Sequence, residues 1–320
     1  MLNHSNKYDY TAAGNLPAKL LKRKAECVYS TGRIAPYHVQ VCPTNVCNLN
    51  CEFCSCKERE RGLSLDMGDL VESVRDLRAL GTKAMTITGG GEPCCYPHLD
   101  TLIEITHRSR IRVGLVTNAY LLHTLDSINR LTWCRVSVSD DRDVDKLLGQ
   151  LDGVVQNRID WAFSYVVTKR YSPEKLRRVV EYANRYDFTH VRVVGDLMDI
   201  ESTPTMAMVR ETLSSIDDSK VIYQDRRDYT RGARHCLISL LKPVLAPDGY
   251  FYPCCGVQYA KKDAQGTFPE DMRMFRMSQI NSFYSIQQPF NGIMCDKCYY
   301  SDYNDVLAMM RSEYEHEEFI

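Results

Sequence analysis

Long hydrophobic runs are missing from this chain of 320 residues, and so is an excess of charge of one sign. No apolar segment is long enough to cross a bilayer, and the first residues lack the pattern of a secretory signal. We therefore expect a cytoplasmic protein without a membrane partner. The 40 basic and 41 acidic residues nearly cancel, so the overall charge gives no general attraction to duplex nucleic acid.

Cysteine, in contrast, is abundant, with 14 residues. In a cytosolic chain, clustered cysteines indicate a metal site rather than disulfides. The tightest group, Cys47, Cys51 and Cys54, has C-x3-C-x2-C spacing. Three thiolates on one loop can hold three irons of a 4Fe-4S cubane and leave the fourth iron without a protein ligand. A zinc site fits less well, because zinc needs four ligands and Cys56 is too close for a tetrahedral loop.

Segments typical of strands and helices alternate after residue 36. The expected strands cover residues 38–42, 83–88, 112–117, 133–139, 159–168 and 190–195. Helix-like segments follow them at 66–80, 98–109, 120–131, 144–155, from 172 onward and at 205–216. Parallel strands need crossover connections, so six such units predict an α/β fold with a partial (β/α)6 barrel. Its active-site residues are expected in the loops at the carboxyl ends of the strands.

The cysteine spacing, the aromatic Phe53 before the last cysteine and the order of the elements together resemble the radical S-adenosylmethionine (radical SAM) enzymes, over about residues 36 to 220. The resemblance implies a partial TIM-like barrel and a cluster whose open iron chelates the methionine part of S-adenosylmethionine. It also implies that an electron from the cluster cleaves the cofactor. The 5′-deoxyadenosyl radical formed in this way removes a hydrogen atom from the substrate, and a flavodoxin or ferredoxin supplies the electron.

The same resemblance assigns residues to cofactor binding. The segment after the second strand is similar to the family's GGE motif, and there glycines without Cβ let the backbone approach a ligand while a glutamate pairs with the amino group of the cofactor. For two later strand ends the resemblance implies ribose and methionine contacts, although Asn and Ser in these places also cap helices. Phe53 is expected near the adenine, or as a core aromatic beneath the loop. The residues assigned in this way are Phe53, Gly89, Gly90, Gly91, Glu92, Asn118, Ser137 and Ser139.

A second group of cysteines follows residue 222. Cys236 and Cys254 lie at the two ends of an expected hairpin, with strands at 238–246 and 250–252 and a turn at 247–249. Cys295 and Cys298 form a C-x2-C pair. The pattern resembles the twitch domain, a shortened SPASM domain, which implies one auxiliary 4Fe-4S cluster. A four-cysteine zinc site is the alternative, and Cys255 could replace Cys254 as a ligand.

The expected organisation is therefore an N-terminal extension at 1–35, the barrel at 36–222 and a small hairpin-plus-helix auxiliary-cluster domain at 223–320. Four cysteines outside these motifs are expected to be small core residues. They are Cys27, Cys42, Cys56 and Cys134. An arginine-rich stretch before Cys236 would bind phosphate or carboxylate groups or lie in solvent; it contains Arg226, Arg227, Arg231 and Arg234.

Several functions are compatible with these features. An oxidoreductase would oxidise or cross-link a small molecule or peptide and pass an electron to the auxiliary cluster. A redox-neutral rearrangement, lyase step or epimerisation, on substrates that include a nucleotide or modified nucleobase, would use Cys94 or Cys95 as hydrogen donor, since both follow Glu92 on the active-site face. A non-catalytic iron-sulfur or zinc protein is the third alternative.

Overall fold

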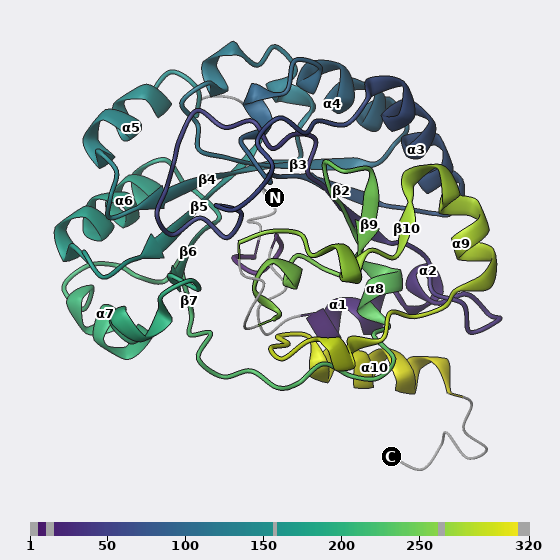
Figure 1. The fold of residues 1–320 in the computed structure, drawn as a ribbon. Helices are drawn as coiled ribbons and strands as arrows, with labels where there is room; N and C mark the ends of the chain where they lie inside the picture. Colours follow the sequence, from purple (N-terminus) through teal and green to yellow (C-terminus); the bar gives the residue numbers. More distant parts are fainter. Residues whose placement is uncertain (1–5, 11–15, 156–158, 262–265, 313–320) are drawn as a thin grey trace.

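In the part of the chain that the structure describes, ten strands form one sheet. The computed structural model describes residues 6–10, 16–155, 159–261 and 266–312 (Figure 1). The strand order is β10-β9-β8-β1-β2-β3-β4-β5-β6-β7. Neighbours from β8 to β7 pair in parallel, whereas β9 and β10 pair antiparallel. The strands are β1 (His38–Val41), β2 (Ala84–Ile87), β3 (Arg112–Thr117), β4 (Trp133–Ser139), β5 (Asp160–Val167), β6 (His190–Gly195), β7 (Val221–Gln224), β8 (Val244–Leu245), β9 (Tyr250–Tyr252) and β10 (Phe275–Arg276).

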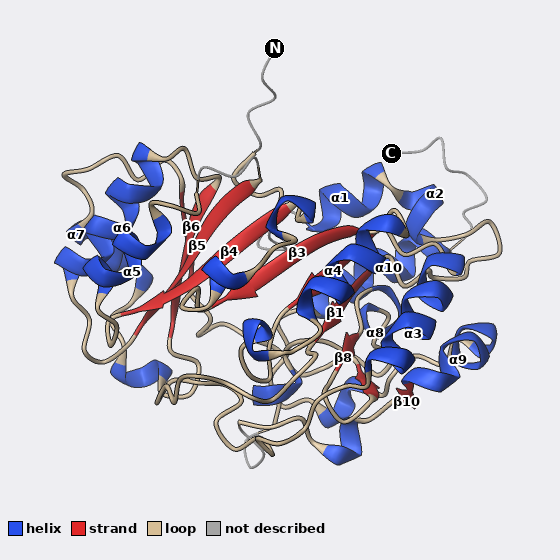
Figure 2. Ribbon diagram, turned by 90° about the horizontal axis from the view of Figure 1, so that it is seen from above, coloured by secondary structure: helices blue, strands red, loops and turns tan. Residues whose placement is uncertain are grey.

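Helices cover the outer face of the curved sheet. Figure 1 shows α3 to α7 along this face, with α1, α8 and α10 on the inner side. Figure 2 shows the long loops gathered at the edge of the sheet toward which the arrow of β4 points, with α1 and α2 on the other side. The predicted α/β partial barrel is thus confirmed. The helices are α1 (Leu16–Lys22), α2 (Lys24–Cys27), α3 (Met67–Ala79), α4 (Leu99–Arg108), α5 (Val144–Leu151), α6 (Pro173–Arg185), α7 (Met206–Thr212), α8 (Ile238–Leu241), α9 (Ile280–Ile286) and α10 (Ser301–Arg311).

The helix boundaries follow from local chemistry. The Asp66 side chain accepts a hydrogen bond from the backbone N–H of Asp69 and caps α3, and Ser172 caps α6 in the same way. Pro173 then occupies the first turn of α6, where a missing N–H costs nothing. No helix among the described residues has the length and apolar composition that crossing a membrane requires.

The helix expected at 120–131 is absent from this described segment. Two 3-10 turns, η2 (Leu122–Thr124) and η3 (Ile128–Arg130), replace it. The buried apolar residues of the segment 120–131 recur every three positions. This spacing places them on one side of a 3-10 helix rather than of an α-helix. They are Leu122, Leu125, Ile128 and Leu131.

Two further expectations are corrected near the C-terminal half. The strand expected at 238–246 divides into the short helix α8 and the strand β8, because a continuous apolar run does not distinguish a buried helix turn from a strand. The strand β7 is an addition, since no strand was expected between residue 195 and Cys236. Pairing with β6 places β7 at the end of the sheet.

The predicted hairpin is present and continues the barrel sheet. Its strands β8 and β9 pair antiparallel around a turn at Gly249, which has φ +80°. The Asp248 side chain accepts hydrogen bonds from the Tyr250 backbone N–H and the Tyr252 hydroxyl and so fixes this turn. On its other edge β8 pairs with β1. The hairpin that leads to Cys254 is therefore paired directly with the strand that leads into the first cysteine loop.

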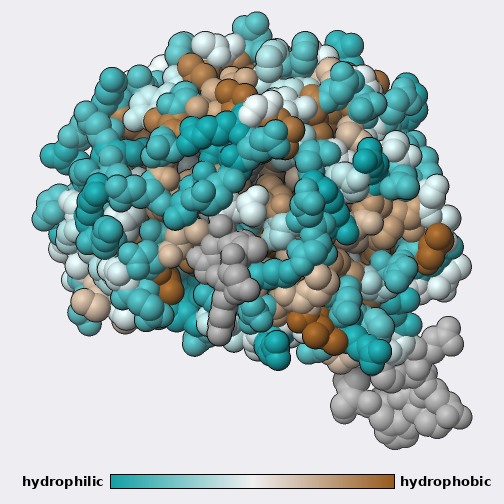
Figure 3. All heavy atoms as spheres, viewed as in Figure 1, coloured by the Kyte–Doolittle hydropathy of each residue, from teal (hydrophilic) through white to brown (hydrophobic). Residues whose placement is uncertain are grey.

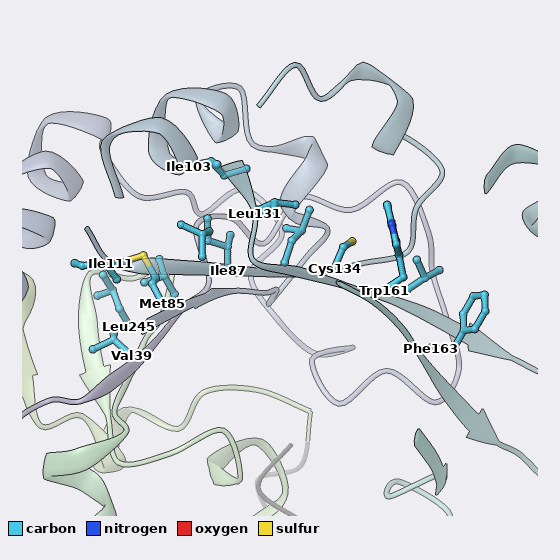
Figure 4. Close-up of a cluster of buried hydrophobic side chains, with 14 of the residues drawn as sticks. Val39, Met85, Ile87, Ile103, Ile111, Leu131, Cys134, Trp161, Phe163 and Leu245 are labelled. Carbon is cyan, nitrogen blue, oxygen red and sulfur yellow. The ribbon is translucent and has the colours of Figure 1, made fainter. Parts of the chain in front are cut away.

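The main hydrophobic core lies between the sheet and the outer helices. Figure 4 shows Ile87 from β2, Cys134 from β4 and Ile103 from α4 within it. The face of the molecule seen in Figure 3 is mainly hydrophilic, with hydrophobic residues in small groups. The four cysteines expected as core residues are all buried: Cys27, Cys42, Cys56 and Cys134.

Side chains alternate along β4. Cys134, Val136 and Val138 belong to the buried hydrophobic core. Successive side chains of a strand point to opposite faces, so Arg135, Ser137 and Ser139 face the inside of the barrel.

Candidate active site

The first cysteine loop leaves the carboxyl end of β1. It closes on itself through hydrogen bonds from Leu65 N to Pro43 O (2.8 Å) and from Asn45 Nδ2 to Glu60 O (2.9 Å). Cys47, Cys51 and Cys54 are half-buried free cysteines on this loop. Among the described side chains, no group of three or more His, Cys, Asp or Glu is arranged so that it could hold a metal ion, so the ligand roles remain predictions.

Two buried arginines adjoin the loop. Arg59 donates to the Cys54 sulfur (3.6 Å) and to the Asn45 carbonyl (2.8 Å). Burial raises the pKa of the Cys51 thiol, and the charge and hydrogen bond of Arg142 oppose this rise. Cationic neighbours of this kind stabilise thiolate, which is the form that binds metal. Neither arginine was predicted from the sequence, where only the position of Arg142 just after the fourth expected strand indicates a role.

The glycine segment packs against the backbone that precedes Cys47. Gly91 N donates to Thr44 O, and Glu92 N donates to Val46 O, each at 2.8 Å. A Cβ on Gly91 would lie 2.0 Å from the Val46 carbonyl oxygen, which excludes any larger residue. The structure thus brings the predicted GGE segment and the cysteine loop together. Gly89 and Gly90 are equally crowded by Gly91 and Asn45.

Glu92 is buried, and its carboxylate is held by neutral donors. One oxygen accepts from the Thr117 hydroxyl (2.5 Å) and the Cys94 backbone N–H (3.1 Å), and the other accepts from Asn118 N (2.7 Å). No described Lys, Arg or His forms an ion pair with it. Its negative charge is therefore available to a cationic group of a ligand, such as the amino group of an amino acid.

Asn118 connects β3 to the cysteine loop. Its side-chain Nδ2 donates to Oδ1 of Asn48, between Cys47 and Cys51, at 2.7 Å. Its own Oδ1 accepts from Tyr120 N at 3.1 Å, so the local turn expected of an asparagine is present as well. The sequence did not indicate that Asn48 belongs to this site, because nothing in the cysteine spacing distinguishes it from other loop residues.

Ser137 and Ser139 lie at the carboxyl end of β4. The Ser139 hydroxyl is buried and has no hydrogen-bond partner among the described residues, which suits a ligand contact. The Ser137 carbonyl accepts from Arg142 at 2.7 Å. Phe53 is half-buried on the loop and belongs to neither cluster of buried hydrophobic residues, so the expectation of a core aromatic is not met.

Cys94 and Cys95 occupy the short turn η1 (Pro93–Cys95) directly after Glu92. The Cys94 sulfur lies 3.5 Å from the Thr117 hydroxyl. Burial and then the charge of Glu92 raise the pKa of both thiols, more strongly for Cys94. Both residues therefore carry S–H at neutral pH, which is the form that can give a hydrogen atom.

The four C-terminal cysteines line one small pocket. Segments around 230–236 and 290–298 pair here, with hydrogen bonds from Gly232 N to Cys295 O (3.0 Å) and from Cys298 N to Thr230 O (2.8 Å). A Cβ on Gly232 would lie 1.9 Å from the Gly292 carbonyl oxygen. The lining contains the thiols of Cys236, Cys254, Cys295 and Cys298 beside the small residues Gly232, Ala233, Gly256, Ala260 and Gly292.

Two of these four sulfurs accept hydrogen bonds from the backbone. The Gly256 and Tyr300 backbone N–H groups donate to the sulfurs of Cys254 and Cys298 at 3.3 and 3.4 Å. Hydrogen bonds to sulfur are one way in which proteins tune an iron-sulfur cluster. Cys255 does not line this pocket; its sulfur lies 3.5 Å from the Tyr300 hydroxyl.

The profile of the Radical SAM superfamily matches residues 41–215, which is more than half of the chain. The chain belongs to the radical SAM superfamily. Members of this superfamily are enzymes that use S-adenosylmethionine and a 4Fe-4S cluster.

Other comparisons extend the likeness beyond the matched segment. An uncharacterized protein of Methanocaldococcus jannaschii is 25% identical over 219 residues, which are 56% of this chain and 51% of that protein; the chain thus spans about half the length of this curated relative. Streptococcus suis SuiB bound to its precursor peptide SuiA has a TM-score of 0.59 at 16% identity, covering 93% of this chain and 77% of SuiB. The structure of anSMEcpe with bound AdoMet and a Kp18Cys peptide has a TM-score of 0.56 at 13% identity, covering 88% and 86%. These two structures show a shared fold.

Proposed function

We propose that this radical SAM protein removes a hydrogen atom from a C–H bond of a small molecule or peptide and passes one further electron to an auxiliary 4Fe-4S cluster. The substrate then loses a proton or forms a new bond, so the net change is a two-electron oxidation or a cross-link. The observation that carries the proposal is the pocket of four cysteines and small residues beside the barrel.

Cys47, Cys51 and Cys54 would hold the first cluster. When bound, the cluster and S-adenosylmethionine supply the 5′-deoxyadenosyl radical that begins the reaction. Glu92 would bind the cationic amino group of the cofactor, because its carboxylate has no cationic partner among the described residues. Arg142 would hold positive charge at Cys51 while its contacts to the Asn118 and Ser137 carbonyls keep it in place.

Cys236, Cys254, Cys295 and Cys298 would hold the auxiliary cluster. Burial raises the pKa of Cys236 to about 12 and that of Cys295 to about 11, so assembly of the cluster must displace their protons. Tyr299 and Tyr300 line this pocket and also a cavity inside the barrel. An electron acceptor would therefore lie one layer of side chains from a substrate in the barrel.

The substrate class includes peptides, since SuiB and anSMEcpe are both described with a bound peptide. We expect a flavodoxin or ferredoxin as reductant and a cytoplasmic location. A four-cysteine zinc site remains the alternative for the second pocket, and metal analysis distinguishes the two.

A redox-neutral reaction is the second candidate, supported by the protonated thiols of Cys94 and Cys95 beside Glu92. Here a thiol gives a hydrogen atom to the substrate radical and becomes a thiyl radical. One electron and one proton return it to the thiol, and the auxiliary cluster could supply that electron.

Anaerobic reconstitution with iron and sulfide, followed by S-adenosylmethionine and dithionite, tests the proposal. We expect 5′-deoxyadenosine from the wild-type protein and none from Cys51→Ala. A reconstituted wild-type protein that contains iron but yields no 5′-deoxyadenosine would indicate the non-catalytic alternative.

A further inference from the structure

A cavity lies inside the barrel, on the face of the sheet away from α3 to α7. It has a volume of about 280 Å³, at the lower end for sites that bind small molecules. Residues from β1, β4, β6 and β7 line it, and the C-terminal segment closes one side with Tyr299 and Tyr300.

The lining is strongly cationic. Arg135, Arg192, Arg226 and Lys242 all contribute to it. The carboxylate among the lining residues is that of Asp225, which pairs with Arg227 at 2.9 Å. None of the four cations forms an ion pair with a carboxylate in the described residues. Cys255 also lines the cavity, and although burial raises the pKa of its thiol, Lys242, the Tyr300 hydrogen bond and Arg226 together lower it. Four positive charges thus share one cavity with a single thiol and without a carboxylate partner.

The hydrogen bonds of these cations go to neutral oxygens. Arg192 donates twice to the Ser164 hydroxyl, at 2.8 and 3.2 Å. Arg226 donates to the Tyr259 hydroxyl at 3.2 Å and to the Gln224 side chain at 3.3 Å. The Arg135 guanidinium lies over the Trp133 ring, and its buried Nε has no hydrogen-bond partner among the described residues. At least one N–H group of these cations therefore lacks an acceptor inside the cavity.

The burial of several positive charges close together is energetically unfavourable. Burial lowers the pKa of Arg135 to about 10, with Cys255 opposing this change and Arg226 adding to it. Burial, Arg135 and Arg226 lower the pKa of Arg192 well below its ordinary value. Buried charge without a partner destabilises a fold, and an anion placed among the cations would remove both the repulsion and the unmet donors.

We infer that Arg135, Arg192, Arg226 and Lys242 bind an oxyanion of the substrate, either a phosphoryl or a carboxylate group. This inference rests on the proposed function, because it treats the cavity as the chamber in which that reaction takes place. Guanidinium groups suit this task, since their planar N–H pairs match the oxygens of both groups.

The position of the cavity fits an anchor for one end of a substrate. On β4, Arg135, Ser137 and Ser139 face the barrel in succession, and each step of two residues spans about 6.6 Å. A substrate held at Arg135 therefore extends toward the carboxyl edge where Glu92 and the cysteine loop lie. Tyr299 and Tyr300 separate it from the four-cysteine pocket. The anchored molecule would lie between the two predicted clusters.

The arginine-rich stretch noted in the sequence contributes a single residue to this cavity. Arg226 points into it, whereas Arg227 donates to the carbonyls of Ile200 and Thr203. Arg231 and Arg234 are exposed. The cations of the cavity therefore come from β4, β6 and the segments that follow β7 and α8, and no local run of sequence indicates that they lie together.

Calorimetric titration of the reconstituted, S-adenosylmethionine-bound protein tests the inference. The probes are inorganic phosphate and succinate, with neutral succinamide as control. We expect one of the two anions to bind saturably and succinamide not to bind. Binding of phosphate identifies a phosphoryl group, and binding of succinate identifies a carboxylate. Failure of both anions to bind would overturn the inference.

Variants locate the site. Arg135→Gln and Arg192→Gln should weaken anion binding about tenfold or more, as expected for loss of a charged hydrogen bond. Arg135→Lys should recover part of the affinity, and Arg75→Gln, on the exposed face of α3, should change nothing. Unchanged affinity in both glutamine variants would contradict the assignment.

Two further measurements control for misfolded variants and for failure of the proposed function. If a glutamine variant does not fold, the wild-type Tm should rise with the binding anion but not with potassium chloride at equal ionic strength. The formation of 5′-deoxyadenosine is measured on the same samples. Cofactor cleavage without anion binding rejects this inference alone, whereas anion binding without cofactor cleavage rejects the proposed function.

Discussion

One carboxylate oxygen of Glu92 accepts a 2.7 Å hydrogen bond from the backbone N–H of Asn118. This bond joins the loop after β2 to the end of β3, and the Asn118 side chain continues the connection to Asn48 on the cysteine loop. Glu92, Asn118 and the cysteine loop are therefore one hydrogen-bonded unit rather than separate loops. A substitution of Glu92 should therefore affect binding of the cofactor, while the cysteines that are expected to hold the cluster stay in place.

Glu92→Gln should weaken the binding of S-adenosylmethionine about tenfold or more. The amide removes the negative charge and offers one fewer acceptor to Asn118 and Thr117. Equilibrium dialysis against reconstituted protein measures the change, with iron content as a check on folding. Glu72→Gln on the exposed face of α3 is the matched control. Equal affinity in Glu92→Gln and the control would remove Glu92 from the cofactor site.

Iron analysis tests both sets of cysteines. Two 4Fe-4S clusters need about eight irons, so Cys51→Ala and Cys236→Ala should each lose about half. Cys27→Ala, in the core, should keep the full iron content. The pair Cys254→Ala and Cys255→Ala separates the two adjacent thiols, and we expect iron loss only in the first. Zinc bound at the second site would contradict the auxiliary cluster.

Arg142→Met should slow the formation of 5′-deoxyadenosine and shift the reduction potential of the first cluster to more negative values. Charge near the sulfurs influences this potential, and the positive charge of Arg142 opposes the rise in the pKa of Cys51. A redox titration followed by electron paramagnetic resonance measures the shift. Arg142→Lys should restore part of it, since the lysine keeps the charge. A potential that is unchanged in both variants would limit Arg142 to holding the Asn118 and Ser137 carbonyls.

Solvent deuterium distinguishes the two candidate reactions once a product is identified. Oxidation should leave the product free of solvent deuterium at the reacting carbon. Transfer from a thiol would place deuterium there, because the S–H groups of Cys94 and Cys95 exchange with D2O. Deuterium that disappears in Cys95→Ala but persists in Cys27→Ala would count against the dehydrogenase and in favour of the redox-neutral reaction.

Stability should fall in mild acid because of His190. Burial, followed by Arg135 and Arg192, lowers its pKa to about 3 in the fold, against about 6.5 when unfolded. Below pH 6.5 the unfolded chain takes up a proton that the native state does not. Unfolding free energy should therefore decrease by about 2 kcal/mol between pH 7 and pH 5 from this residue alone. Urea unfolding of His190→Asn should show a smaller decrease, and His107→Asn, exposed on α4, should match the wild type.

The sequence predicted the first six strands almost to the residue, because each is a short apolar run bounded by polar or turn-forming residues. It also predicted the residues that the structure gathers around Glu92, since the spacing of these motifs is set by the strands that carry them. It did not predict Arg59, Arg142 or the four cations of the cavity. These side chains come from separate loops and strands, and only the closed sheet makes them neighbours.

The strand β7 and the turns η2 and η3 were missed for a different reason. A four-residue strand next to a charged stretch carries too few apolar residues to set a period. Residues 122–131 have a period near three, which resembles that of a helix in a short window. In both places tertiary packing, rather than local preference, decides the conformation.

The pairing of β8 with β1 has a consequence for how the chain folds. Gln40 pairs with Val244, so about 200 residues separate the two partners. Until the hairpin is synthesised, one edge of β1 presents unpaired N–H and C=O groups, and such edges invite aggregation. Contacts so distant in sequence also slow folding. The C-terminal hairpin thus acts as the closing step that protects the nascent barrel, in addition to carrying its cysteines.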